Sequence, residues 1–554
     1  MSAPTFGGKL ATVGEQGMSL PAEGSPAGAV REKLLGLFTL SEDALALERQ
    51  VEARVSELAH EFARNPRVST DIEVSRIVEA SADYRIPSAP SDVRDYVEDI
   101  ASNLVAHSIN TASPRYIGHM TSALPYFVRP LGKLMTAINQ NPVKMETAKS
   151  FSPYERQVMA MMHRLVFRMK DRFYDEHAHS RESTLGMMTT GGTEANLCAL
   201  WCARNQSLRG EGNLPAVSKS GLIAALKARG YEGAAIVGSN STHYSFQKAT
   251  DVLGVGDDGL IRVAVDRDNR IDLRELRRAL QRCREERLLV FALVGVAGTT
   301  DSGAVDPLND LADIAQEYGI HFHVDAAWGG ALLFSERHRH ILSGIERADS
   351  VTIDGHKQMY LPMGVGMLLL RDPRLARVIE KQAHYVVRSG SMDLGRRTLS
   401  GSRPATVLFV HAALRIIGRQ GYEFLVDEGM GKARYLADLI RSSPQFELLA
   451  EPQSNILLYR YLPEPLRGRA ARGALTEDDN RRVNRLTEQL QKVQRQRGCT
   501  FVSRTTTFNT RYGPEVGVVA LRAVTANPLT TPTDINAVLQ EQLEIAQRLD
   551  AAGA

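Results

Sequence analysis

A lysine and an aspartate in the middle of the chain occupy positions from which they could do chemistry. Lys357 closely follows the apolar run 350–353, and Asp325 follows the earlier apolar run 321–324. A lysine amine can bind an aldehyde as a Schiff base, and a carboxylate can keep a pyridine nitrogen protonated so that the ring accepts electrons. The two residues together predict a site for pyridoxal phosphate, held by Lys357 and with Asp325 beside its ring nitrogen.

A glycine-rich turn upstream is a candidate for holding a phosphate group. Residues 189–196 contain two glycines between threonines and lead directly into a helical pattern. Glycines let the backbone approach an anion, and a helix N-terminus presents unpaired amides and the positive end of its dipole. A plain turn with a threonine cap would use the same residues, but the position of this turn upstream of Asp325 and Lys357 favours a phosphate site.

Two further candidates follow predicted strands. His243 comes just after a strand that ends near Gly238, and an imidazole there could stack on a flat ring and contact a substrate carboxylate. Thr300 follows the strongly apolar run 289–294 and supplies a hydroxyl. The alternatives are a structural histidine and an ordinary turn at the end of a strand.

The elements that must position these residues alternate between strands and helices. Between about Gly186 and Leu370, short apolar runs alternate with helical stretches, and Asp306-Pro307 opens a helix predicted over 308–318. Such alternation predicts an α/β fold whose mostly parallel central sheet is covered by helices on both faces. Ligands of these sheets collect at the carboxyl ends of the strands, where Asp325 and the region of Lys357 fall. The predicted strands lie at 234–237, 289–294, 321–324, 350–353 and 366–370.

The rest of the chain is expected to form separate parts. Helical periodicity continues from 31 to about 107, and a smaller α+β domain follows from 401, with a helix over 477–497. Residues 1–30 are rich in small residues and lack the apolar core of a signal peptide or membrane span, so we expect a flexible extension. The predicted parts are an extension (1–30), a helical segment (31–110), a large domain (111–400) and a small C-terminal domain (401–554).

Composition indicates an ordinary globular protein. The 554 residues carry a formal net charge of +3 and 43% hydrophobic residues, which demands neither a nucleic acid nor a membrane partner. The four cysteines are too few and scattered for a disulfide framework, so we expect reduced thiols in the cytoplasm. No second cysteine pair accompanies Cys198 and Cys202, and we predict no metal.

These motifs in this order resemble the group II pyridoxal phosphate-dependent amino acid decarboxylases over about 114–421. Segments 115–125, 139–141 and 401–405 are similar to the bacterial aspartate 1-decarboxylase branch of that family. The resemblance implies a fold type I PLP-dependent transferase-like architecture. It also implies a homodimer with its site at the subunit interface, across which the helical N-terminal segment would pack.

The resemblance also assigns roles to individual residues. Lys357 would hold pyridoxal 5'-phosphate and Asp325 its ring nitrogen. Tyr385 is the candidate proton donor after loss of CO2, with His384 as the other contender. Arg403 offers the bidentate geometry that a substrate carboxylate favours, although it could equally hold the two lobes together. The other expected residues are His243, stacked on the ring; Gly192 and Thr193 at the phosphate; Thr300, Ala327 and His356 in the cofactor pocket; and His119 and Asn139 toward the substrate.

The predicted reaction is decarboxylation of an acidic L-amino acid, with aspartate to β-alanine preferred over glutamate to 4-aminobutyrate. Aromatic amino acid decarboxylation, another PLP lyase or an aminotransferase would use the same cofactor residues. A metal-dependent hydrolase is a further alternative, because His321, His323 and Asp325 alternate onto one face of a strand. A catalytically silent scaffold is disfavoured, because no core cofactor residue is replaced.

Overall fold

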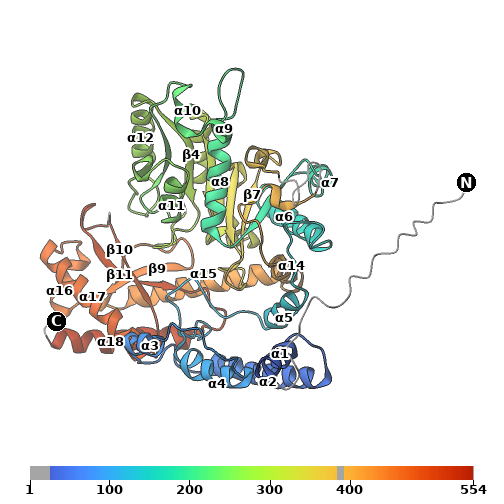
Figure 1. The fold of residues 1–554 in the computed structure, drawn as a ribbon. Helices are drawn as coiled ribbons and strands as arrows, with labels where there is room; N and C mark the ends of the chain where they lie inside the picture. The colour runs from blue at the N-terminus through green and yellow to red at the C-terminus, as the bar shows by residue number, and fades with distance from the viewer. Residues whose placement is uncertain (1–24, 383–391, 509, 553–554) are drawn as a thin grey trace, which may run out of the picture. The chain divides into compact units, whose positions relative to one another are not determined.

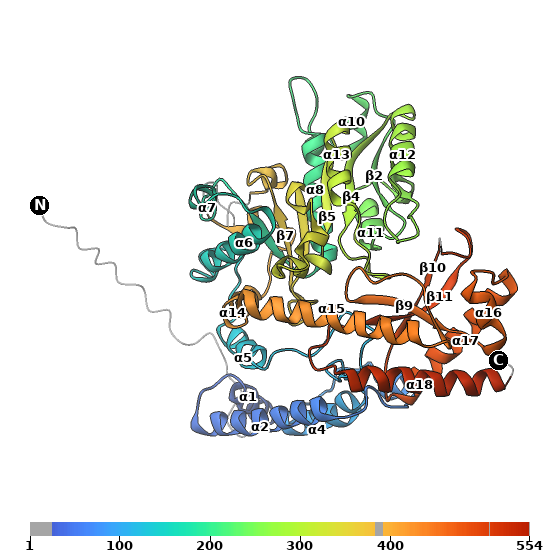
Figure 2. The ribbon, with the colours of Figure 1, turned by 180° about the vertical axis from the view of Figure 1, so that it is seen from behind.

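The computed structural model describes residues 25–382, 392–508 and 510–552. Within them the chain forms two compact units, one of residues up to 65 together with 70–109, and one of residues 66–69 together with 110–554. Each unit is shown in Figure 1 and, from behind, in Figure 2. No helix of the described residues is both long enough and apolar enough to cross a membrane.

The first unit is helical, as its periodicity predicts. Helix α2 is amphipathic, begins at the N-cap Ser41 and has no fully buried residue. Helix α1 begins at Pro26, inside the segment expected to be a flexible extension, because Ser25 caps the helix and a proline suits its first turn. The helices of this unit are α1 (Pro26–Gly36), α2 (Glu42–Arg64), α3 (Val74–Ala80) and α4 (Val93–Asn103).

The second unit contains the predicted sheet. Its seven strands have the order β1-β7-β6-β5-β4-β2-β3, and the pairs from β6 to β3 are parallel, whereas β7 runs antiparallel to both its neighbours. The mostly parallel α/β architecture is therefore confirmed. The strands are β1 (Gly186–Thr189), β2 (Gly233–Ser239), β3 (Leu260–Val263), β4 (Leu288–Val296), β5 (His321–Asp325), β6 (Ser350–Asp354) and β7 (Gly366–Leu370).

Helices cover both faces of this sheet (Figures 1 and 2). Apolar residues of α8, α10 and α11 pack on one face, and those of α6, α12 and α13 pack on the other. The helix predicted over 308–318 is α13, with the same bounds. The helices are α5 (Val128–Ile138), α6 (Phe151–Phe167), α7 (Asp171–His177), α8 (Gly192–Ser207), α9 (Val217–Ser220), α10 (Leu222–Lys227), α11 (Ser245–Val252), α12 (Leu273–Glu285) and α13 (Leu308–Tyr318).

A second, smaller core belongs to the C-terminal part of the same unit. Helices α15, α17 and α18 pack on the four-stranded sheet β10-β11-β9-β8. Residues of α14 and the first half of α15 pack with the large core, and the second half of α15 packs with the smaller one. The elements are α14 (Val407–Ile416), α15 (Gly418–Ser442), β8 (Phe446–Leu448), β9 (Ile456–Tyr461), α16 (Glu464–Ala471), α17 (Glu477–Arg497), β10 (Ser503–Thr507), β11 (Val518–Val524) and α18 (Pro532–Ala551).

Candidate active site

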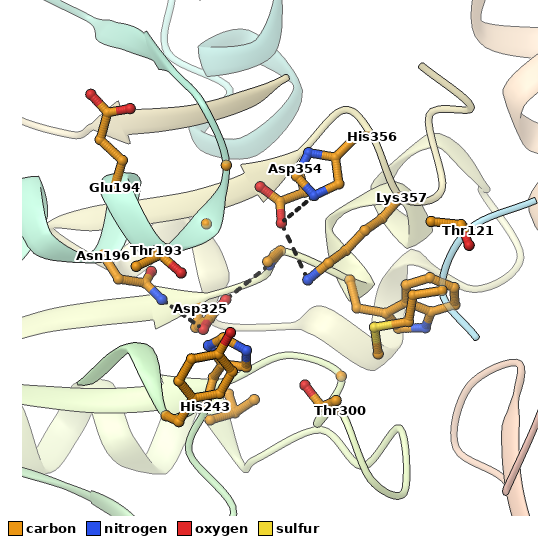
Figure 3. A pocket seen from close by; sticks show the side chains of 18 of the residues that line it. Thr121, Thr193, Glu194, Asn196, His243, Thr300, Asp325, Asp354, His356 and Lys357 are labelled. Atoms are coloured by element: carbon orange, nitrogen blue, oxygen red, sulfur yellow. Dashed lines mark hydrogen bonds and ion pairs between the residues drawn. The ribbon is translucent and has the colours of Figure 1, made fainter. Parts of the chain in front are cut away.

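A cavity of about 560 Å³ lies at the carboxyl edge of the large sheet. Its walls come from the ends of β4, β5 and β6, the start of α8 and the segment around His119 (Figure 3). The structure thus brings together residues that the sequence separates by more than two hundred positions. The predicted site residues that line it are His119, Gly192, Thr193, His243, Thr300, Asp325, Ala327, His356 and Lys357.

The lysine lies in a short turn after β6. Its Nζ is 3.2 Å from Asp354 Oδ2, and Asp354 is the last residue of that strand. His356 Nδ1 donates to the carbonyl oxygen of Val365 at 2.9 Å, and its Nε2 lies 3.5 Å from Asp354 Oδ2. The side chain of Lys357 keeps 19% exposure, so the amine is held at the cavity wall and still open to a ligand.

The start of α8 is built to receive an anion. Gly191 precedes the helix and offers no side-chain cap, so amides of the first turn remain without such a partner. A Cβ on Gly191 would lie 3.0 Å from His356 Cε1, and its φ of 155° also favours glycine. The motif 189–196 therefore needs glycine for close packing and leaves a helix N-terminus facing the cavity.

Asp325 ends β5, and a chain of hydrogen bonds holds it in place. Asn196 Nδ2 donates to Asp325 Oδ2 at 2.9 Å, and His323 Nε2 donates to Asn196 Oδ1 at 3.0 Å. Ser350 Oγ lies 2.8 Å from both His323 Nδ1 and His321 Nε2. Because the amide oxygen only accepts, His323 must carry its proton on Nε2 and accept at Nδ1. Burial lowers the pKa of His323 to about 3, so the imidazole stays neutral.

These hydrogen bonds argue against the alternative of a metal site. One face of β5 does carry His321, His323 and Asp325. Both histidines bond to Ser350, however, and Asn196 bonds to His323 and to Asp325. No group of three potential metal ligands converges within the described residues. The alternating pattern instead belongs to the support of Asp325.

His243 and Thr300 close the cavity from below in Figure 3. His243 lies between β2 and α11, and its Nδ1 accepts a hydrogen bond from the backbone N–H of Ser245 at 3.2 Å. Burial lowers the pKa of His243, which favours a neutral ring with its proton on Nε2. A neutral imidazole facing Asp325 and Lys357 is suited to stacking on a flat ring.

Two predicted residues do not line this cavity, and a third lies outside the described part of the chain. Asn139 caps the C-terminus of α5 in the left-handed conformation, with φ 39°, and does not line the cavity. Arg403 is buried and its Nη2 donates to Glu155 Oε1 of α6 at 2.5 Å, which fits the alternative that it holds elements together. Tyr385, like His384, lies outside the residues that the structure describes.

Three residues near the cavity were not singled out from the sequence. Asn196 and Asp354 stand within the motifs that drew attention, but their roles depend on partners in other elements. Arg522, on β11, donates to the carbonyl oxygens of Thr300 at 2.9 Å and Gly118 at 3.3 Å. A lone arginine within the apolar run 518–524 was the only signal for it.

Comparisons with known proteins show the family of this chain. The profile of the pyridoxal-dependent decarboxylase conserved domain matches residues 77–462. The chain belongs to the pyridoxal-dependent decarboxylase family. Aspartate 1-decarboxylase of Aliivibrio fischeri is 45% identical over 519 residues, which cover 93% of this chain and 94% of the relative. Cysteine sulfinic acid decarboxylase of Mus musculus is 29% identical, covering 82% and 87% of the two chains.

Solved structures show the same fold for this decarboxylase. A crystal structure of mouse CSAD matches with a TM-score of 0.79 at 26% identity, covering 92% of this chain and 99% of that one. The glutamate decarboxylase domain of a Vibrio parahaemolyticus protein matches with a TM-score of 0.76 at 23% identity, covering 93% and 99%. The fold type I architecture is thereby confirmed, and this decarboxylase is a carboxy-lyase that uses pyridoxal phosphate.

The residues of this decarboxylase fit that cofactor. An amine, a supported carboxylate and an uncapped helix N-terminus are the three groups that its aldehyde, ring nitrogen and phosphate require. The cofactor supplies the ring into which electrons flow when a bond at the substrate's α-carbon breaks. The cavity thus offers a binding group for each part of the cofactor.

Proposed function

We propose that this enzyme decarboxylates L-aspartate to β-alanine and CO2. The observation that carries the proposal is the 45% identity to an aspartate 1-decarboxylase over nearly the whole of both chains. The alternative is L-glutamate to 4-aminobutyrate, which needs the same cofactor residues and one more methylene of room. One methylene in a pocket changes the binding free energy by only about 1–3 kcal/mol. The size of the pocket, rather than a different set of reactive groups, would therefore separate the two substrates.

In this proposal Lys357 holds the cofactor, Asp325 keeps its ring nitrogen protonated and His243 stacks on the ring. Gly192 and Thr193 bind the phosphate, while Thr300, Ala327 and His356 complete the pocket. The support is that all of these residues line one cavity and that Asn196 orients Asp325. The proton donor after loss of CO2 stays a prediction for Tyr385.

The cation for the substrate's second carboxylate is Arg522 in this proposal, in place of Arg403. The guanidinium contacts the carbonyls of Thr300 and Gly118, beside the cavity residues Thr300 and His119. Its Nε is buried and has no hydrogen-bond partner among the described residues, so this donor is unused in the structure. Burial lowers the pKa of the His119 imidazole, and the positive charge of Arg522 lowers it further, so the neutral form is favoured.

We also propose a homodimer whose interface includes the segment between His119 and the end of α5. Apolar side chains on this segment are solvent-exposed in the single chain, among them Tyr126, which is 79% exposed. Exposed apolar clusters of this kind mark protein interfaces. Because the segment begins at a cavity residue, a partner docked there would border the site. The exposed apolar residues of the segment are Leu124, Tyr126, Leu134 and Ile138.

The substrate test supplies the cofactor-loaded enzyme with each amino acid separately. CO2 release and product identity are measured for aspartate, glutamate, cysteine sulfinate, 2,4-diaminobutyrate and aromatic amino acids. The highest kcat/KM for aspartate, with β-alanine as the product, supports the proposal. A glutamate preference would shift it to the alternative, and a preference for a basic or aromatic substrate would overturn the acidic substrate class.

The role of Lys357 is tested separately with Lys357→Ala. The variant should lose the visible absorbance of the covalently bound cofactor together with CO2 release, because no other lysine of the described residues lines the cavity. Lys381→Ala, an exposed lysine at the end of a described segment, is the control and should keep both. Full activity in Lys357→Ala would contradict the assignment and favour a scaffold that does not use this lysine.

A further inference from the structure

Asp354 is a buried carboxylate that the proposed chemistry does not use. It ends β6, is 3% exposed and points toward Lys357 and His356 (Figure 3). Its Oδ2 makes both contacts, at 3.2 Å to Lys357 Nζ and 3.5 Å to His356 Nε2. Oδ1 is buried and has no hydrogen-bond partner among the described residues. Burying a carboxylate oxygen without a hydrogen-bond partner costs folding free energy, which suggests that Asp354 has a functional role.

The carboxylate also lies against the start of α8. A Cβ built on Gly192 would be 3.1 Å from Asp354 Oδ2 and 3.5 Å from Oδ1, so the carboxylate is the nearest group to this glycine. The positive end of the helix dipole favours one anion there. In the structure that anion is Asp354, whereas the proposed cofactor site puts a phosphate at the same helix end.

Two anions at one helix N-terminus repel each other strongly when both are out of water. Lys357 is the cation that balances Asp354 in the structure, but its nitrogen is also the atom that must bind the cofactor. The present ion pair therefore cannot persist unchanged once the cofactor is loaded. Asp354 would then lie beside the phosphate without the free ammonium group of Lys357 that now balances its charge.

We propose that loading of pyridoxal phosphate is coupled to the uptake of one proton by Asp354, which leaves a neutral carboxyl beside the phosphate. The proton comes from solvent and bonds to a carboxylate oxygen, and no other bond changes in this step. The neutral carboxyl gains an O–H donor, the group that a phosphate oxygen accepts from. The inference rests on the proposed phosphate site at Gly192 and Thr193.

The surroundings of Asp354 support this direction. Burial raises the pKa of Asp354, and the nearby carboxylate of Asp325 raises it further, while Lys357 and His356 oppose the shift. The charge of Asp354 also acts on His243, across the cavity. Glu194, in the first turn of α8, points away, because its carboxylate accepts from Thr190 and Ser400.

Protons taken up on binding are counted by titration calorimetry of the cofactor-free, full-length protein at pH 8, in two buffers of different ionisation enthalpy. Wild type should take up about one more proton per site than Asp354→Asn when pyridoxal phosphate binds, because the asparagine keeps the shape but cannot titrate. Cofactor affinity of wild type should also fall more steeply with rising pH than that of the variant. Equal proton counts in the two proteins would overturn the proposal.

Two controls separate this linkage from other effects. Glu194→Gln removes a carboxylate from the same helix turn, and it should take up as many protons as wild type; a loss equal to that of Asp354→Asn would overturn the assignment to Asp354. Pyridoxal without its phosphate should give equal counts in wild type and Asp354→Asn. A difference that persists with pyridoxal would place the linkage at Lys357 and overturn the role of the phosphate.

The proposal remains testable without a folded Asp354→Asn. Wild type alone should take up about one more proton with pyridoxal phosphate than with pyridoxal at pH 8. An equal count would overturn the linkage, whereas absence of both heat and visible absorbance would overturn the cofactor site itself. The two failures are therefore distinguishable.

Discussion

The side-chain amide of Asn196 donates a hydrogen bond to Asp325 Oδ2 across 2.9 Å, which joins the first turns of α8 to the end of β5. On its other side the amide oxygen accepts from His323, a neutral imidazole. The amide NH2 can only donate and the amide oxygen can only accept, so the directions of both Asn196 bonds are fixed, and the neutral imidazole must then accept from Ser350. Asp325 is thereby held as an acceptor facing the cavity.

Replacing Asn196 with Ala should weaken cofactor binding. Loss of a hydrogen bond to a buried charged group costs about 1.5–3 kcal/mol, or roughly a 10- to 150-fold rise in the cofactor Kd. The Kd is measured from the visible absorbance during cofactor titration. Asn205→Ala removes a buried amide from the same helix that bonds to Val378 instead, and it should leave the Kd unchanged. A normal Kd in Asn196→Ala would contradict the support of Asp325.

Arg522→Gln should impair selection of an acidic substrate. If its guanidinium pairs with the substrate carboxylate, loss of that charged hydrogen bond should raise KM for aspartate by about 10- to 150-fold. Cofactor absorbance should stay, because Arg522 is not among the residues proposed to hold the cofactor and contacts Thr300 and Gly118 only at their backbone carbonyls. The matched control is Arg504→Gln, an exposed arginine on the neighbouring strand β10. An unchanged KM in Arg522→Gln would remove this residue from substrate recognition.

Buried histidines predict a loss of stability in mild acid. Burial lowers the pKa of His163 to about 4, and its ring lies 3.1 Å from both Tyr174 Oη and the carbonyl oxygen of Leu370. Below the unfolded pKa of about 6.5 the unfolded chain binds a proton that the folded imidazole refuses, so stability falls as pH drops from about 6.5 toward 4. The titration of His163 therefore lowers the free energy of unfolding by about 1.4 kcal/mol for each pH unit in that window.

The check is the melting temperature of wild type and His163→Gln between pH 7.5 and 5. The variant should be less stable at pH 7.5 but lose less stability per pH unit, because glutamine does not titrate. His340→Gln, at an exposed histidine, is the control for removal of an imidazole. Parallel pH profiles for wild type and His163→Gln would contradict the assignment.

A charge on α5 should break the proposed dimer. Leu134→Asp puts a carboxylate on an exposed apolar position of the proposed interface, whereas Ile223→Asp does the same on α10, outside it. Sedimentation should show dimers for wild type and Ile223→Asp and a shift toward monomer for Leu134→Asp, because an unpaired charge in an interface is costly. Equal dimer content in all three proteins would exclude this segment from the interface.

Local patterns alone were enough for much of the fold. The helix predicted over 477–497 is α17 with the same bounds, because Thr476 and Asp479 form a capping box and Gly498 ends it in the left-handed conformation. The strands around Asp325 and Lys357 were likewise predictable, since buried parallel strands appear as apolar runs. The antiparallel direction of β7 was not, because an apolar run carries no sign of its orientation.

The sequence by itself determined the reactive groups of this protein, since a lysine, a carboxylate and a glycine-rich helix start each bear a local signature. Only the tertiary structure decided their partners. It brings Asn196 to Asp325, Asp354 to Lys357 and Arg522 to Thr300, and it leaves Arg403 with Glu155, away from the cavity. The physical reason is that a hydrogen bond or ion pair depends on distances of about 3 Å across elements far apart in the chain, which no local pattern contains.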